Sequence, residues 1–478
     1  MLIYQDYEKV KDNEELKKAF IKRAINEHLA SDMYKIASDA QTYDKQQNST
    51  IMNYVKYIYN QSGLKSKDLI ASNNKLCSNF FHRLNTQRCL YLLGNGVSFA
   101  NKKTVIDEKG NSITIDTTKQ QLGKDFDVDL KNLSYKSLIE GISFGYWDYD
   151  KLQVFSILEF VPLWDEKTSG LRAGIKFWRI GENKPLYIIL FEEDGLTQYI
   201  EYAQKSSQLE ILEQKKAYIR NIQETNEGDI VNIEYTNYPN FPIIPCWGSQ
   251  LHQSTLIGMK GKIDAFDLIR SGFANDLEDC AEIYWILGGA GGMNGSDIAK
   301  FRSKLKLQHI AVVDTDESSA TPYTQDIPYN ARQVFLDSIR SGIYEDFGGL
   351  DVHTISATAT NDHIDAAYQP LDEESDDFEY QIVIFIRNLL KLLNIDDMPI
   401  FTRNRISNQK ELTDMILSAA EYLDEETVLQ KLPFIEVDEI ANILSKKDRE
   451  MAEKYNDEEE EIPEEEPEEE PKEGILNE

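Results

Sequence analysis

The spacing of hydrophobic positions divides the first half of the chain into helical and extended regions. Apolar residues recur every three or four positions in residues 13–30, 47–61 and 68–93, which predicts helices there. From about residue 125 to 245, apolar and polar residues alternate instead, in strings such as "LQVFSILEFVPLWD" and "PLYIILFEE". Turn strings such as "EDG" separate them. This pattern predicts an antiparallel meander, preceded by a helix in "YKSLIEGISFGY".

Helical spacing returns in two long segments after the meander. Residues 252–281 are predicted to form a helix whose apolar stripe holds Ile257, Phe266, Ile269, Phe273, Leu277 and Cys280. Residues 329–347 are predicted to form another, with the stripe Val334 or Phe335, Ile339, Ile343 and Phe347. Between them lie the strand "IYWIL", the polar helix "SDIAKFRSKLK" and the strand "LQHIAVVD". We therefore expect a small α/β insertion between two long helices.

The last part of the chain is predicted to be mostly helical. The small-residue segment "GGLDVHTISATATND" leads into a helix from about 363 to 394, in which Pro370 predicts a kink because proline has no amide hydrogen. The strand "MPIFTRNR" and helices at 408–421, 425–431 and 436–455 follow.

Charge and hydropathy narrow the class of protein. An apolar fraction of 41% predicts a folded chain, and its net charge is −32. Residues 457–478 hold 13 acidic residues against one lysine, so this glutamate-proline tail is predicted to be disordered. The rest of the chain is also acidic. This argues against a protein that binds nucleic acid tightly, because such binding needs an excess of Lys and Arg to neutralise phosphates. The chain has no run of eighteen apolar residues and no signal-peptide pattern at its start, which predicts a cytosolic chain that spans no membrane.

The glycine-rich stretch "GGAGGMNG" does not predict a nucleotide site. A phosphate-binding loop needs a second glycine followed by Lys-Ser/Thr, but the two possible frames place Met293 or Asn294 at that position. The four cysteines lack metal-binding or redox spacing and are predicted to be buried thiols: Cys77, Cys89, Cys246 and Cys280. We expect neither a cofactor nor a structural metal.

Two acidic groups offer alternative chemistry. Asp362, His363 and Asp365 contain metal-binding side chains, although a capped helix start explains "TNDHID" equally well. A cluster of carboxylates that could bind two metals in a nuclease, or form a solvated helix face, comprises Asp372, Glu373, Glu374, Asp376 and Asp377. The basic residues Lys300, Arg302, Lys304 and Lys306 are typical of a soluble helix and also suit an acidic partner.

Several strings, and their order, resemble the portal proteins of tailed bacteriophages, especially those of siphophages with Gram-positive hosts. "NNKLCSNFFHRLNTQRCLYLLGNGVSF" resembles a helix of that family that ends in Leu-Gly. "FPIIPCWGSQLHQSTLIGMKGKIDAFDLIRSGF" is similar to its Ile-Pro strand and following helix, with the core Ile263 to Asp267. "FTRNRISNQKELTDMIL" and the turn from Leu432 to Phe434 are similar to its C-terminal helix pair. The resemblance spans roughly residues 15–455.

The resemblance implies an α+β portal fold that assembles into a dodecameric ring. It implies the following parts: a wing (1–251), a first stem helix (252–281), a clip (282–328), a second stem helix (329–347), a tunnel loop (348–362), a kinked wing helix with a strand (363–404), a helical crown (405–456) and the acidic tail (457–478). In this arrangement "GGAGGMNG" is the turn from the stem into the clip.

The resemblance also implies a function without catalysis. The ring would sit at one capsid vertex as the channel for DNA packaging and ejection, in contact with terminase large subunit, head-tail adaptor, major capsid and scaffolding proteins, after assembly in the host cytoplasm. Residues expected to line the channel are Leu350, Asp351, Val352, His353, Thr354, Ile355 and Ser356. Residues expected to bind partners at the clip are Asn294, Lys300, Arg302, Lys304 and Lys306. The alternatives are a portal of a prophage remnant or gene-transfer particle, or a metal-dependent nuclease.

Overall fold

The computed structural model describes most of the chain, in two units. It covers residues 3–59, 64–68, 71–106, 112–149, 151–202, 208–224, 230–280, 284–288, 296–297, 319–323, 329–354, 360–405, 409–432, 435, 440 and 443–447. The first unit comprises Met1–Asp351 and Gln369–Asn404, and the second comprises Val352–Tyr368 and Arg405–Glu478.

Helices open the first unit, and side chains cap two of them, α2 and α3. They are α1 (Tyr4–Glu8), α2 (Glu14–Ala30), α3 (Asp32–Asp44) and α4 (Ser49–Met52). Asn13 caps α2 by accepting hydrogen bonds from the amides of Glu15 and Leu16. The predicted helix at 47–61 is wrong beyond Met52, because the chain continues into the hairpin β1 (Tyr57–Tyr59) and β2 (Lys65–Lys67).

Two other helix predictions have the wrong bounds. The predicted helix at 68–93 begins only at Phe80, as α5 (Phe80–Leu93). The helix predicted in "YKSLIEGISFGY" is α7 (Phe126–Glu140), which begins before this string and ends within it, with Gly141 as its C-cap. Gly141 has a φ of +90°, which favours glycine and ends the helix, and the chain then enters a strand.

Antiparallel strands form the predicted meander. They are β6 (Ile142–Asp148), β7 (Lys151–Ser156), β8 (Phe160–Trp164), β9 (Leu171–Arg179), β10 (Leu186–Glu192), β11 (Gly195–Glu201), β12 (Leu209–Lys216), β13 (Ile219–Glu224), β14 (Ile230–Thr236) and β15 (Ile243–Trp247). A five-stranded sheet has the order β12-β11-β10-β9-β8, and a three-stranded sheet has the order β15-β6-β7. Smaller elements before them are β3 (Val97–Phe99), β4 (Lys102–Ile106), β5 (Ser112–Asp116) and α6 (Thr117–Leu122).

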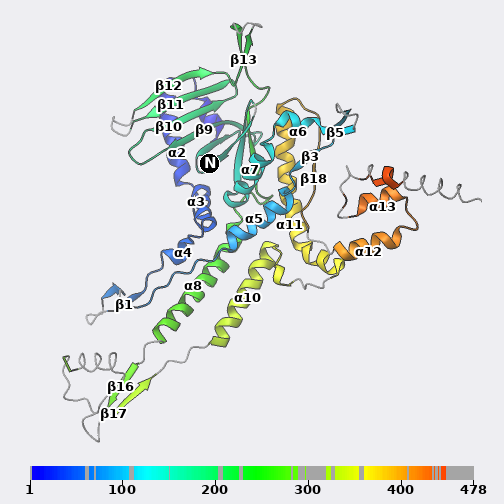
Figure 1. The fold of residues 1–478 in the computed structure, drawn as a ribbon. Helices are drawn as coiled ribbons and strands as arrows, with labels where there is room; N and C mark the ends of the chain where they lie inside the picture. Colours follow the sequence, from blue (N-terminus) through cyan, green and yellow to red (C-terminus); the bar gives the residue numbers. More distant parts are fainter. Residues whose placement is uncertain are drawn as a thin grey trace, which may run out of the picture. The chain divides into compact units, whose positions relative to one another are not determined.

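Helix α2 covers one face of the five-stranded sheet (Figure 1). Phe20, Ile21 and Ala24 on α2 pack with Ile175 and Ile188 of the sheet in one buried cluster. These side chains leave water almost completely, and burial of apolar area is the main force that holds a helix on a sheet.

The long helices of the second half are confirmed. They are α8 (Leu256–Cys280), α10 (Tyr329–Phe347) and α11 (Asn361–Leu392), followed by β18 (Pro399–Phe401), α12 (Gln409–Ala419) and α13 (Glu425–Lys431). Helix α11 contains Pro370, and the kink there stays a prediction. The C-terminal half of α11 buries Phe378, Phe385 and Leu389 against α5 and α7 in the largest core cluster. The α+β class is therefore confirmed, whereas the strand "LQHIAVVD" lies outside the described residues.

Candidate functional site

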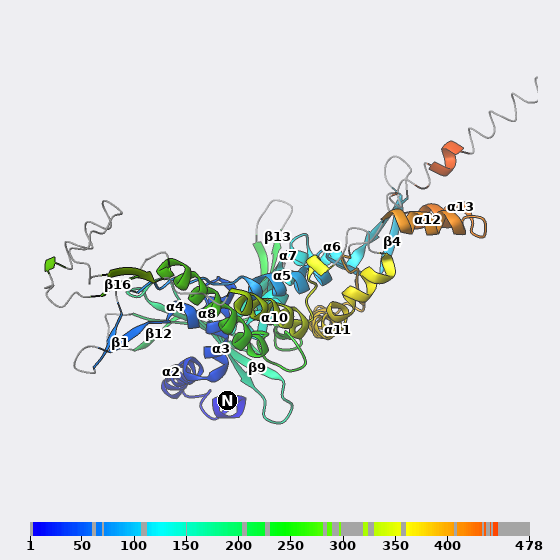
Figure 2. The ribbon, with the colours of Figure 1, turned by 90° about the horizontal axis from the view of Figure 1, so that it is seen from below.

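Helices α8 and α10 lie side by side (Figures 1 and 2), and we refer to this pair of helices as the stem. At one end of the stem, Leu256, Met259 and Ile263 of α8 pack with Ile343 and Phe347 of α10. Ion pairs join the helices along their length: Lys262 with Asp346, and Arg332 with Asp276. Exposed pairs of this kind contribute little stability each, so the buried apolar contacts carry most of the pairing.

An extended segment, residues 71–79, is fastened to α8 by side chains four residues apart. The amides of Asn74, Leu76 and Ser78 donate to Asn275 Oδ1 (2.6 Å), Ser271 Oγ (3.0 Å) and Asp267 Oδ1 (2.9 Å), respectively. Two residues of extended chain advance about 6.6 Å and four residues of helix about 6.0 Å, so the two repeats match. These bonds explain why this segment is extended rather than part of the predicted helix at 68–93.

Asp267 is the buried member of this set. Its side chain also accepts a hydrogen bond from Asn48 Nδ2, and burial raises its pKa despite the hydrogen bonds from Asn48 and Ser78. One turn away, Asp264 accepts from Tyr43 and Thr50, while Lys260 pairs with Asp39 at 3.1 Å. The stem is thus anchored to α3 and α4 by polar contacts.

The buried face of α8 differs from the predicted stripe. Burial follows Leu256, Met259, Ile263, Asp267, Ser271 and Asn275, whereas two members of the predicted stripe are exposed: Ile257 (45%) and Leu277 (54%). The prediction was wrong because polar side chains bind the 71–79 segment and so occupy the buried face. On α10, Ile343 and Phe347 are buried as predicted, and Val334 and Phe335 are exposed.

Three glycines add to the open surface of α8. A Cβ atom placed on Gly258, Gly261 or Gly272 would meet nothing within 4 Å among the described residues. Glycine inside a helix costs roughly 1 kcal/mol relative to alanine. One subunit therefore carries a stem surface of exposed apolar side chains and bare backbone.

A two-stranded ribbon lies at the far end of the stem. Strand β16 (Tyr284–Gly288) follows α8 and pairs with β17 (Ser319–Tyr323), which precedes α10 (Figure 1). The predicted strand "IYWIL" is confirmed, and β17 was not predicted. The predicted partner-binding residues Asn294, Lys300, Arg302, Lys304 and Lys306 lie outside the described residues.

The chain turns sharply after α10 and is fixed against α5. Gly348 has a φ of +64°, and a Cβ there would lie 2.8 Å from the Pro370 carbonyl oxygen, so glycine is required. Gln87 forms two hydrogen bonds with the backbone of Leu350, one to each polar group. Leu350 is only 5% exposed, so in a single subunit it packs against the body.

The exposed part of this segment begins beyond Leu350. Asp351 pairs with Arg340 of α10 at 2.9 Å, and Val352, His353 and Thr354 form a short 3₁₀ turn. Val352 is 47% exposed and the His353 side chain is also exposed. Ile355 and Ser356 lie outside the described residues.

Arg88 is a buried cation at the foot of the stem. Its guanidinium group donates to the Phe347 carbonyl oxygen, lies over the Phe347 ring and pairs with Glu374 at 3.1 Å. Burial lowers its pKa, and the carboxylates of Glu374 and Asp377 oppose that change. Arg88 therefore links α5, the end of α10 and α11.

The acidic groups considered as metal sites have structural partners. Arg403 binds Asp372, Asp376 and Glu379, and the Gln250 amide donates to Asp377. Asp365 pairs with Arg405, and α11 begins at Asn361, so Asp362 and His363 lie in its first turn; the side-chain cap stays a prediction. Among the described residues, no three His, Cys, Asp or Glu side chains are placed to hold a metal ion. No described helix is long and apolar enough to cross a bilayer.

Sequence reasoning missed the polar residues that anchor the stem. Asp267, Ser271 and Asn275 recur every four residues, which was a signal for a polar helix face. Nothing local predicted that residues 71–79 would occupy that face, because the two segments are far apart in the sequence.

Comparisons with known proteins agree with the resemblance. Residues 34–465 match the profile of a family described as "Phage portal protein, SPP1 Gp6-like". A curated protein named "Portal protein", from Clostridium phage phiCD119, is 23% identical over 453 residues, which cover 87% of this chain and 96% of that protein.

Proposed function

The chain belongs to the SPP1 Gp6-like family of phage portal proteins, and we propose that it forms a closed ring at one capsid vertex through which DNA enters and leaves. Twelve subunits are the expected number. The ring is a virion component and conduit, with no catalysis of its own. It assembles in the host cytoplasm before it becomes part of the particle.

The observation that carries this proposal is the uncovered surface of the stem. Ile257, Leu277, Val334 and Phe335 are exposed, and three glycines of α8 leave its backbone bare. Head-to-tail contacts through two different faces generate a ring when the rotation closes. We propose that neighbouring stems cover these faces in the ring.

The charge of the chain suits a channel. The whole chain carries a net charge of −32, of which the tail 457–478 contributes −12, so the body carries −20 and gives little of the salt-dependent attraction that phosphate-binding proteins have. Such attraction would have to be broken at each step of a moving duplex. We propose that double-stranded DNA passes without sequence-specific contact, and that the segment 348–362 lines the narrowest part.

The parts of the subunit are proposed to follow the order of the elements. The wing spans 1–251 and 363–404, the stem 252–281 and 329–347, the clip 282–328, and the crown 405–456. We propose that the clip contacts terminase and the head-tail adaptor through Asn294, Lys300, Arg302, Lys304 and Lys306. Capsid and scaffolding proteins are the other expected partners.

The mass of the assembly tests this proposal. Purified full-length protein should contain a species of about twelve times the 55.0 kDa of one chain, which mass photometry resolves. The variant Ile257→Glu, Val334→Glu places charge on the exposed stem faces and should shift the distribution toward monomer. A wild-type chain that stays monomeric at every concentration, or forms open filaments, would contradict the ring.

A further inference from the structure

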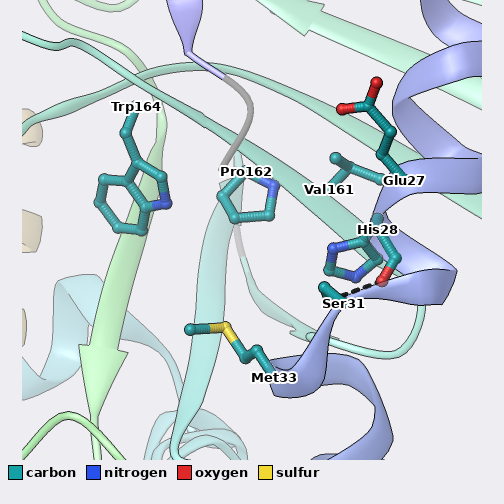
Figure 3. A pocket seen from close by; sticks show the side chains of 7 residues that line it. All are labelled: Glu27, His28, Ser31, Met33, Val161, Pro162 and Trp164. Carbon is teal, nitrogen blue, oxygen red and sulfur yellow. Dashed lines mark hydrogen bonds between the residues drawn. The ribbon is translucent and has the colours of Figure 1, made fainter.

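A pocket and a hairpin of the first unit take no part in the stem contacts described above. The pocket has a volume of about 220 Å³ and lies beside the edge strand β8, where the Ser31 hydroxyl group donates to the His28 carbonyl oxygen (Figure 3). Sites for small molecules usually measure about 300–1,000 Å³, so this pocket is small for a ligand site. The hairpin of β1 and β2 instead presents exposed apolar and basic side chains.

The hairpin lies on the side of α8 that faces away from α10. The residues that flank it, Asn48 and Ser78, both form hydrogen bonds with Asp267 of α8. Helix α10 forms its ion pairs with Lys262 and Asp276 instead. Because an α-helix turns by about 100° per residue, these two residues lie about 140° and 180° around the helix from Asp267. Figures 1 and 2 both show α8 between the hairpin and α10.

The hairpin also lies toward the end of α8 where α10 begins. From Ser78 back to Asn74, the extended segment 71–79 moves from Asp267 to Asn275, toward the C-terminal end of α8. At that end of α8, Asp276 pairs with Arg332 near the start of α10. The hairpin precedes this segment, so it is level with the first half of α10 (Figure 1).

The exposed side chains of the hairpin are apolar or positively charged. Tyr57 and Leu64 are exposed, and so are Lys65 and Lys67. The Lys65 Nζ atom lies 4.0 Å from the centroid of the Tyr57 ring. Residues 52–76 contain four lysines and one aspartate, a net charge of +3 in a chain whose net charge is −32. The hairpin therefore suits a partner surface that combines apolar groups with carboxylates.

The first half of α10 has such a surface, and it points away from α8. Ile343 packs toward α8 in a buried cluster, and Val334 and Ser338 precede it by nine and five residues. At about 100° per residue, they lie about 180° and 140° around the helix from it, and both are exposed. Phe335 and Asp337 are exposed beside them. This outward face of α10 therefore combines two large apolar side chains with a carboxylate.

We propose that the hairpin of one subunit packs on the outward face of α10 of the next subunit, with its lysines near Asp337 and its apolar side chains against Val334 and Phe335. The inference rests on the proposed ring, in which each contact joins two different faces of the same chain. These two faces lie on opposite sides of α8 at the same level, as a head-to-tail contact between copies requires. Duplex DNA is a poorer occupant of the hairpin, because few lysines act within a strongly acidic chain.

Photochemical cross-linking of the full-length protein tests the proposal. We place p-benzoylphenylalanine at Tyr57, irradiate the assembled protein, separate the products on a denaturing gel and map them by mass spectrometry. Covalent dimers and larger products should form, with adducts within residues 329–347. The same group at Tyr149, an exposed residue between β6 and β7, should give no adduct in that range.

Two results would overturn the proposal in different ways. Rings seen by mass photometry without adducts in 329–347 would contradict the hairpin contact and leave the ring standing. Monomer at every concentration would contradict the ring itself, and the hairpin contact with it.

Exchange of charges tests the same contact without a probe. Lys65→Glu, Lys67→Glu should raise the protein concentration at which half of the chains are in rings at least about threefold, because like charges would then meet at Asp337. Adding Asp337→Lys to this variant should lower that concentration again at least about twofold. Failure of the added substitution to restore assembly would contradict the contact.

A matched control and a DNA-binding measurement complete the experiment. Lys102→Glu, Lys103→Glu makes the same charge change on β4 and should alter the half-assembly concentration less than about twofold. Melting temperatures of all variants establish folding. An equal effect of the control would overturn the proposal. So would a hairpin variant that loses binding to a fluorescent DNA duplex while its ring assembly is unchanged, which would assign the hairpin to nucleic acid.

Discussion

At the scale of single residues, Arg88 is the side chain on which the foot of the stem depends most. It is 4% exposed and links Phe347 at the end of α10 to Glu374 on α11. The Glu374 side chain is 48% exposed, so water can solvate it once Arg88 is gone, and the main loss is the charge-assisted hydrogen bond to the Phe347 carbonyl oxygen. Such a bond contributes about 1.5–3 kcal/mol, and Arg88→Met should lower the free energy of unfolding by roughly that amount.

Chemical denaturation measures the effect, with Arg83→Met as the matched control. Arg83 lies on the same helix with an exposed side chain, so its loss should change stability by less than about 0.5 kcal/mol. Equal effects of the two substitutions would show that Arg88 does not hold the stem.

Glu140 gives a pH dependence with a definite sign. It is 3% exposed and accepts hydrogen bonds from Gln41, Ser156 and the Ile157 amide. Burial raises its pKa, with these hydrogen bonds opposing the change. The pKa of Glu140 is therefore higher in the folded state than in the unfolded state. Its contribution to the free energy of unfolding is fully present below the unfolded-state pKa and is lost as pH rises through the folded-state pKa.

Replacing Glu140 by Gln removes this titration. The stability of Glu140→Gln relative to wild type should therefore be greater at pH 7 than at pH 4, and urea unfolding at both values measures it. A difference that is constant between the two pH values, or larger at pH 4, would contradict the assignment.

Single residues also show which buried positions could be predicted from the sequence and which could not. The burial of Ile343 and Phe347 on α10 was predicted correctly, because both side chains pack on apolar neighbours. The buried face of α8 was not predicted, because Asp267 and Asn275 point inward and accept hydrogen bonds from backbone amides of the segment 71–79. Leu350 was expected in the channel, yet in one subunit it is buried on α5 through contacts that no local pattern encodes.

At the scale of elements, substitutions at the glycines of α8 should affect the stability of the subunit and the assembly of the ring in opposite directions. Gly258→Ala and Gly261→Ala meet open space, so each should stabilise the isolated subunit by roughly 0.5–1 kcal/mol. If a neighbouring stem packs on this face, the added methyl groups should weaken the ring.

Melting temperature and the ring fraction at several concentrations measure the two effects. Gly181→Ala, in a surface turn with room for a methyl group, is the control and should leave the ring fraction unchanged. A more stable subunit with an undiminished ring fraction would place the neighbour elsewhere.

The segment after α10 yields a second element-scale prediction. Val352 is exposed, so Val352→Arg or Val352→Glu should change the stability of the subunit by no more than about 0.5 kcal/mol. Repeated around the ring, the bulky charged side chain should obstruct the channel and prevent packaging, whereas Val352→Thr should not.

This prediction is tested by measuring the amount of nuclease-protected DNA per particle together with the yield of rings. Normal DNA content in the Arg and Glu variants would remove Val352 from the channel wall. A parallel fall in ring yield and DNA content would identify the segment as a packing element instead.

At the scale of the whole molecule, most of the architecture could be predicted from the order of hydrophobic patterns along the sequence. Alternation predicted the meander, and helical spacing predicted α8, α10 and α11 to within a few residues at most ends. The extended segment 71–79 and the β16–β17 pairing arise from contacts between distant segments. Such contacts depend on the tertiary fold, which local spacing does not determine.

A cryo-electron microscopy reconstruction of the purified full-length protein tests the central claim most directly. We predict a closed ring with an open axis, neighbouring stems in contact through the exposed faces of α8 and α10, and Val352 and His353 facing the axis. A ring that presents residues 348–362 on its outer wall, or a particle with no central opening, would contradict the account.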